Sequence, residues 1–92
     1  MSRSDDTSQK PAGEADEKQL LPIGKAAQQA GLSRQSVQYY LMLGLLEPTQ
    51  TTPTGRRLFG PKAIERLRLI KHLNASGYTL RAIRELFLRH HN

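Results

Sequence analysis

Residues 22–44 read PIGKAAQQAGLSRQSVQYYLMLG, and this segment holds the start and stop signals of two short helices. Proline suits the first turn of a helix, and Pro22 precedes alanines that recur at helical spacing. Gly31 is a typical helix stop, and Ser33 is a suitable N-cap for a second helix over residues 34–43. Two short helices joined by such a turn predict a helix-turn-helix.

The second predicted helix has different inner and outer faces. At about 100° per residue, Val37, Tyr40 and Leu41 point inward. The outward residues, with Arg34 at the edge, are polar or aromatic apart from one methionine: Gln35, Gln38, Tyr39 and Met42. Amide and aromatic side chains therefore dominate the predicted exposed face of this helix.

A two-stranded hairpin is predicted after the second helix. Residues 45–48 are expected to form a short edge strand, because proline is confined to sheet edges, and the next apolar pair is residues 58–59. Residues 49–57 between them are polar and favour turns, which places Arg56 and Arg57 on an exposed wing.

Two further helices are expected to complete the domain. Gly60 and Pro61 begin a third helix, and Thr79 caps a fourth. Their apolar residues recur at helical spacing: Ala63, Ile64, Leu67, Ile70 and Leu73 in the third, and Leu80, Ile83, Leu86 and Phe87 in the fourth. The predicted fold is mostly α-helical with a small β-hairpin wing, a winged helix-turn-helix of four helices.

The 92-residue chain has room for one small domain, and its charge is uneven. Residues 1–19 carry three basic and five acidic groups and almost nothing apolar, so we expect a disordered polar tail. The domain is expected over residues 20–89, with a frayed end at 90–92. Residues 20–92 carry eleven basic and three acidic groups, a balance of +8, which favours a polyanionic partner such as nucleic acid.

Several function classes have no support in the sequence. The chain has no cysteine, no catalytic motif and no apolar stretch of the about 20 residues that a membrane span requires. The adjacent His90 and His91 cannot form a closed metal site without further ligands. We therefore expect a non-enzymatic cytoplasmic protein of the nucleoid, with no metal, no cofactor and no small-molecule effector site.

The order of these features resembles the DNA-binding domain of MerR-type bacterial transcription regulators over about residues 22–88. Three stretches carry the resemblance: residues 23–33 (IGKAAQQAGLS), residues 37–48 (VQYYLMLGLLEP), and residues 54–59 (TGRRLF) with the helices that follow. No single piece is specific, but the ordered set at these spacings is.

This resemblance implies that the helix over 34–43 enters the major groove of double-stranded DNA and that a wing over 47–59 lies on the flanking backbone. Glutamine side chains can make bidentate contacts to adenine, and arginine can bind guanine or phosphate. The candidate DNA-binding residues are Ser33, Arg34, Gln35, Gln38, Tyr39, Arg56 and Arg57.

The chain departs from the family pattern in several places. Gln38 stands where arginine is usual, Leu41 where an acidic residue is usual, and Arg56 where an aromatic residue follows the wing glycine. Full-length members continue into a dimerisation helix and an effector domain, whereas this chain stops at Asn92. We therefore expect a stand-alone DNA-binding domain that is monomeric in free solution. Further copies on DNA or a larger protein partner would supply a second contact.

Two other functions remain open at this point. One is an architectural factor resembling phage excisionases, which share the fold and bend DNA. The other is an adaptor that uses the same fold to bind a protein. An adaptor would need an exposed apolar groove, and only Met42, Leu43 and Leu88 are candidates for it.

Overall fold

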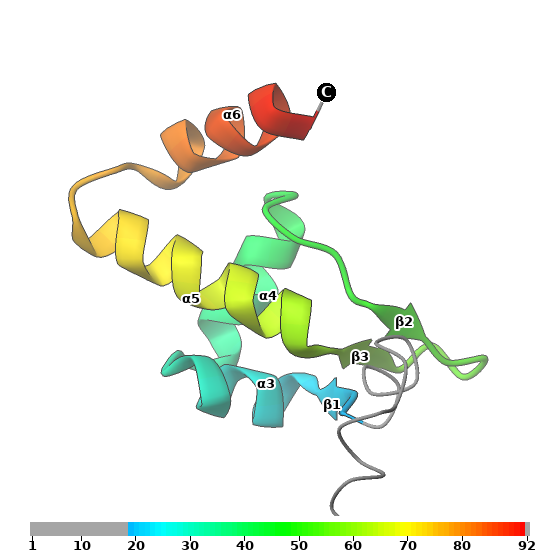
Figure 1. Ribbon diagram of the computed structural model, residues 1–92. Helices are drawn as coiled ribbons and strands as arrows, with labels where there is room; N and C mark the ends of the chain where they lie inside the picture. Colours follow the sequence, from blue (N-terminus) through cyan, green and yellow to red (C-terminus); the bar gives the residue numbers. More distant parts are fainter. Residues whose placement is uncertain (1–18, 92) are drawn as a thin grey trace, which may run out of the picture.

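The computed structural model describes residues 19–91 (Figure 1). The predicted disordered tail therefore lies outside the described residues except for Gln19, as does Asn92 at the C-terminal end. The elements are β1 (Leu21–Pro22), α3 (Ile23–Ala30), α4 (Arg34–Met42), β2 (Gln50–Thr51), β3 (Arg57–Phe59), α5 (Pro61–Ala75) and α6 (Leu80–His91). Within residues 19–91, four helices and a small wing confirm the predicted fold class.

The helix-turn-helix forms where the start and stop signals predict it. Gly31 follows α3 with φ of 73°, a left-handed conformation that suits glycine and turns the chain away from the helix axis. The Ser33 side chain then accepts a hydrogen bond from the Ser36 backbone N–H and caps α4. The second helix ends at Met42, one residue before the predicted end.

The sheet contains one strand more than the predicted hairpin. It has three antiparallel strands in the order β1-β3-β2, with Leu21 opposite Phe59 and Gln50 opposite Leu58. The first strand, β1, was not predicted, because it is only two residues long and carries no alternating pattern.

The prediction of a strand over residues 45–48 is wrong, and the strand of the wing lies at β2 instead. Leu45 and Leu46 are both buried, whereas consecutive residues of a strand with one buried face alternate between core and solvent. The Leu45 carbonyl accepts a hydrogen bond from Arg66 Nε at 3.0 Å instead of joining a ladder. This segment is a loop that fills the core.

Helix α5 lies between α3 on one side and α6 on the other (Figure 1). The core forms where α3, α4, β3, α5 and α6 meet, and it is nearly all apolar. Its largest fully buried side chains are Phe59, Leu45, Leu67, Ile70, Ile83 and Val37. The predicted inward residues of α4 and α5 are buried or half-buried, as expected. Helix α6 continues to His91, into the segment predicted to be frayed.

No helix within residues 19–91 combines the length and the apolar character needed to cross a membrane.

Candidate nucleic-acid interface

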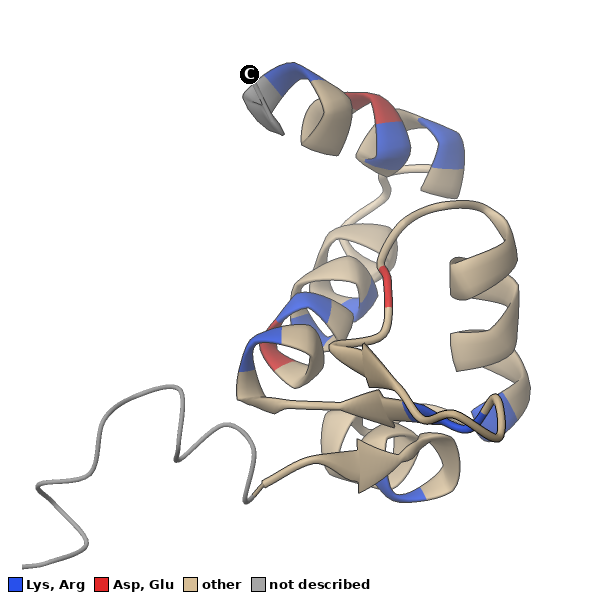
Figure 2. Cartoon of the chain, turned by 90° about the vertical axis from the view of Figure 1, so that its right-hand side faces the viewer, with Lys and Arg blue, Asp and Glu red and all other residues tan. Residues whose placement is uncertain are grey.

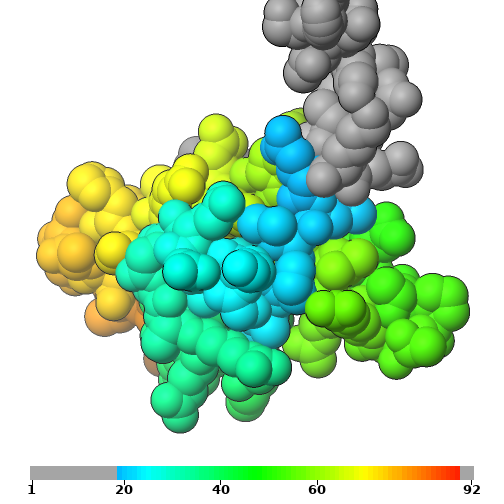
Figure 3. Space-filling view, turned by 90° about the horizontal axis from the view of Figure 1, so that it is seen from below, coloured from blue at the N-terminus to red at the C-terminus, as the bar shows by residue number. Residues whose placement is uncertain are grey.

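A groove of about 610 Å³ lies between the helix-turn-helix and the wing, here defined as residues 50–59. Figure 3 shows α3 and α4 side by side, with the wing projecting next to them. The groove is lined from three directions: by Pro22, Ile23, Gly24, Lys25 and Gln28 at α3, by Arg34 and Gln38 of α4, and by Gly55, Arg56 and Arg57 of the wing. We call it the basic groove.

Four basic side chains converge on this groove: Lys25, Arg34, Arg56 and Arg57. Figure 2 shows the basic residues of the wing close to those of α3 and of the start of α4. All four are exposed, and none has a side-chain hydrogen bond or ion pair with another described residue. Four like charges without internal counter-ions produce a positive potential that attracts a polyanion.

The turn of the wing is held by its own hydrogen bonds. Thr52 N–H donates to the Arg56 carbonyl at 2.8 Å, and its hydroxyl accepts from Arg56 N–H at 3.0 Å. Gly55, with φ of 88°, makes the tight turn, and its N–H donates to the Thr52 carbonyl at 2.8 Å. These bonds fix the backbone from which Arg56 and Arg57 extend.

The exposed face of α4 carries the side chains that the sequence predicts. Gln35, Gln38 and Tyr39 are exposed, and of these only Gln38 reaches the lining of the basic groove. The two adjacent tyrosines differ sharply, since Tyr39 is 50% exposed and Tyr40 only 6%. Burial also raises the pKa of the Tyr40 hydroxyl. Tyr40 is thus a core residue, whereas Tyr39 is available for contact.

The Ser33 hydroxyl forms two hydrogen bonds with Ser36 of the same chain. It accepts a hydrogen bond from Ser36 N–H and donates one to Ser36 Oγ, both at 3.0 Å. Of the seven candidate residues, the structure brings Arg34, Gln38, Arg56 and Arg57 together at the groove. Gln35 and Tyr39 lie on the neighbouring face of α4, and Ser33 serves as its cap.

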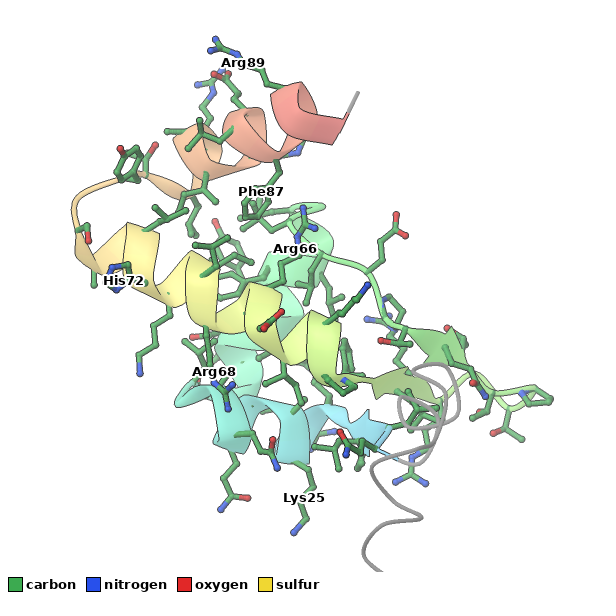
Figure 4. All side chains as sticks on the ribbon, viewed as in Figure 1. Lys25, Arg66, Arg68, His72, Phe87 and Arg89 are labelled. Atoms are coloured by element: carbon green, nitrogen blue, oxygen red, sulfur yellow. The ribbon has the colours of Figure 1, made fainter. Side chains whose placement is uncertain are left out.

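Lys25 and Gln28 line the groove and were not among the candidate residues. Both are exposed on α3, opposite the buried alanines, and Lys25 projects away from α5 (Figure 4). The sequence offered one signal for them, because polar residues at i and i+3 lie on the same face of a helix. It was not decisive, because the sequence does not show how close α3 lies to the wing.

Two arginines of α5 have a different environment. Arg66 donates through Nε to the Leu45 carbonyl, and its guanidinium carbon lies 4.2 Å from the centre of the Phe87 ring. Arg68 donates to the Gln29 carbonyl at 3.1 Å, so it ties α5 to α3 (Figure 4). These guanidiniums hold elements together, and neither lines the basic groove.

Within the described part of the chain, no group of three or more histidine, aspartate or glutamate side chains is placed to hold a metal ion. Every buried polar side-chain atom there has a hydrogen-bond partner. The exposed cations of the groove are available to an external anionic partner.

Comparison with known proteins gives a consistent picture. The family model described as MerR HTH family regulatory protein matches residues 21–89. The mercuric resistance operon regulatory protein of Bacillus cereus is 33% identical over 64 residues, which cover 70% of this chain and 48% of the relative. This chain thus spans about half the length of the curated relatives that it matches.

Solved structures share the fold. A MerR family transcriptional regulator from Bacillus cereus superposes with a TM-score of 0.69 and 25% identity, covering 75% of this chain and 52% of the regulator. HiNmlR, a MerR family regulator lacking the sensor domain and bound to promoter DNA, gives a TM-score of 0.67 and 28% identity, covering 73% of this chain and 53% of its own.

Proposed function

Since the chain belongs to the MerR family of helix-turn-helix regulatory proteins, we propose that it binds double-stranded DNA as a transcription regulator. The observation that carries this proposal is the basic groove, where four cations lack partners among the described residues. A relative of the same fold was crystallised on promoter DNA, which supports the same kind of ligand here.

In this proposal α4 lies in the major groove, which is about 12 Å wide and admits a helix. Gln35 and Gln38 are exposed on the face of α4 that would meet the base edges. Each amide can make a bidentate hydrogen-bond pair with adenine. Arg34 lies at the first turn of α4, and in this proposal it binds guanine or a nearby phosphate.

The wing and α3 hold the backbone on either side of α4. Arg56 and Arg57 donate to phosphates from the wing, and Lys25 adds a charge from α3. Tyr39 is exposed, and in this proposal its hydroxyl donates to a phosphate beside α4. Ser33 contributes indirectly, because its cap fixes the α4 backbone at the DNA-facing end.

A single domain of this size contacts only a few base pairs. We infer that specificity comes from further copies bound side by side on DNA or from a larger protein partner that supplies a second contact. Titration of DNA with one half-site and with two, compared with light scattering of the free protein, tests this. A tight dimer without DNA contradicts assembly on DNA, and equal affinity per site on both DNAs contradicts cooperativity.

Salt dependence tests the proposed function most directly. With about four to six phosphates neutralised, the slope of log K against log salt concentration should be about −4 to −5 on duplex DNA. A flat response would contradict binding to the DNA backbone.

Base specificity tests the placement of α4. Gln38→Ala and Gln35→Ala should each cost about 1 to 3 kcal/mol at particular base pairs and leave the affinity for random DNA nearly unchanged. Equal losses on specific and random DNA would exclude α4 as the reading helix.

A further inference from the structure

A second hollow, of about 460 Å³, lies between α6, the N-terminal half of α5 and the loop over residues 44–49. We call it the α6 cleft, and none of the described residues that line it lines the basic groove. Helices α3 and α6 lie on opposite sides of α5, so the two hollows belong to different parts of the surface (Figure 1). We propose that the α6 cleft binds an acidic amphipathic segment of a protein partner. This inference rests on the proposed function, because it names the surface for the larger partner of a DNA-bound regulator.

The apolar side of the α6 cleft is only partly covered by the protein itself. Leu88 is 54% exposed, and its neighbour Phe87 is half-buried against the core. Pro48, across the cleft on the loop, is also half-buried. A single exposed leucine on a flat surface needs no explanation, whereas here apolar side chains line a hollow that a partner side chain can fill.

The basic side of the cleft has two side chains that bond to no described residue. Lys62 of α5 and Arg84 of α6 are both exposed and form no hydrogen bond or ion pair within residues 19–91. Arg84 lies over the turn that follows α4, with its Nε 3.5 Å from the position that a Cβ on Gly44 would occupy. Arg66 differs from them, because it donates to a loop carbonyl and lies over the Phe87 ring. Two charges on different helices are therefore available to a ligand in the cleft.

Charge and apolar surface together identify the kind of ligand. Among the described residues that line the cleft, Glu47 is the one acid and three are basic, so the lining attracts carboxylates. A second copy of this chain is disfavoured, because residues 20–92 carry a balance of +8 and like charges repel. The backbone of duplex DNA presents phosphates and leaves the apolar surface at Leu88 uncovered. A segment with carboxylates beside leucine or phenylalanine matches both sides of the cleft.

A synthetic peptide tests the proposal on the full chain in the absence of DNA. The probe has about 15 residues, with leucines on one helical face and glutamates on the other. In nuclear magnetic resonance titrations it should shift the backbone signals of Arg84, Phe87 and Leu88. A peptide of the same composition in shuffled order should leave these signals in place, although both peptides are attracted equally by the basic groove. Cleft signals that do not move, or that move equally with both peptides, would overturn the proposal.

Two variants with matched charge test the basic side of the cleft. Lys62→Ala/Arg84→Ala should weaken binding of the ordered peptide, measured at Phe87, by about fivefold at low salt, because exposed ion pairs are individually weak. Arg81→Ala/Arg89→Ala removes the same charge from residues that do not line the cleft, and Arg89 extends away from α5 (Figure 4). This control should change the affinity much less. An equal loss in both variants would show an effect of net charge alone and would overturn the proposal.

A leucine pair tests the apolar side. Leu88→Ala should weaken binding of the ordered peptide by about fivefold, because less apolar surface is buried. Leu69→Ala, at a leucine that is 46% exposed on α5 and lines neither hollow, is its control and should have little effect. At about 0.5 M salt the loss caused by the two basic substitutions should disappear, whereas the loss caused by Leu88→Ala should persist. Equal losses in the two leucine variants would overturn the proposal.

The other occupants of the cleft give distinct results. Duplex DNA should shift the signals of Arg56 and leave those of Phe87 and Leu88 in place. Cleft shifts as large as those of Arg56 would assign the cleft to the DNA interface and overturn the proposal. Cleft signals that move with protein concentration, without peptide, would assign it to a second copy and overturn it as well. A failure of DNA binding would contradict the proposed function and leave the peptide readout intact.

Discussion

The arginines of the basic groove and those of α5 are the same residue type in two different situations. Arg56 and Arg57 extend from a hydrogen-bonded turn into solvent, and no described residue pairs with them. Arg66 and Arg68 donate to backbone carbonyls of other elements. A guanidinium that bonds to a neighbouring element helps to hold the fold, whereas one that bonds to no described residue is available for a ligand. Charge in the sequence alone does not separate these roles.

The two groups of arginines can be distinguished by measuring DNA affinity and the free energy of unfolding of their variants. Substitutions in the groove should change DNA affinity and leave the free energy of unfolding nearly unchanged. Substitutions in α5 should do the reverse.

The largest effect is expected at the wing. Arg56→Ala/Arg57→Ala should weaken binding to all duplex sequences by about 2 to 4 kcal/mol and reduce the salt slope by about 2, because two phosphate contacts are lost. The free energy of unfolding should change by less than about 0.5 kcal/mol, since both side chains are exposed and bond to no described residue. Binding titrations at several salt concentrations and urea denaturation measure the two quantities.

Arg84→Ala/Arg89→Ala is the matched control for the wing variant. It removes the same formal charge from exposed positions of α6, which do not line the basic groove. A loss of affinity as large as that of the wing variant would show that net charge, and not the groove, determines binding.

The next effect belongs to α5. Arg66→Ala should lower the free energy of unfolding by about 2 kcal/mol, because it removes the hydrogen bond to the Leu45 carbonyl and the contact with Phe87. Arg66→Lys keeps the charge but not the Nε geometry, so it should recover only part of this loss. The salt slope of DNA binding by the folded variants should match that of the wild type. A reduced slope with unchanged stability would move Arg66 into the DNA-binding set.

A smaller effect tests the assignment of Ser33 as a cap. Ser33→Ala should cost about 1 kcal/mol of stability, because the Ser36 N–H loses its acceptor. Ser33→Asp should retain the stability, since aspartate caps equally well and complements the helix dipole. It should nevertheless weaken DNA binding, because it places a carboxylate next to Arg34. If Ser33→Asp is as unstable as Ser33→Ala, the cap assignment is wrong.

The sequence predicts the helices well because their signals are local. Gly31, Ser33 and Pro61 mark helix ends, and the apolar stripes identify the buried faces. The loop over residues 45–48 was mistaken for a strand because a buried apolar pair looks the same in either state. Arg66, which bonds that loop from 21 positions away, leaves no local signal of the contact.

The candidate site was also predictable only where its residues have local signals in the sequence. Arg34, Gln38, Arg56 and Arg57 follow from the exposed face of one helix and from the wing, and these four line the groove. Lys25 and Gln28 depend on the packing of α3 beside the wing, which periodicity does not reveal. The distinction between free and bonded arginines likewise needs the tertiary structure.

The two neighbouring tyrosines of α4 are expected to differ in their effect on stability only at high pH. Burial raises the pKa of Tyr40 above its ordinary value of about 10, so the folded state holds this proton more tightly than the unfolded chain. The stabilisation is fully present below about pH 10 and is lost as the pH rises through the higher folded-state pKa. Urea denaturation of the wild type between pH 9 and pH 11 should therefore show a decline that Tyr40→Phe reduces. Tyr39→Phe, at an exposed position one residue away, should leave the decline unchanged. Equal behaviour of the two variants would mean that Tyr40 is not the titrating core residue, and the division between structural and ligand-facing side chains would fail at its closest pair.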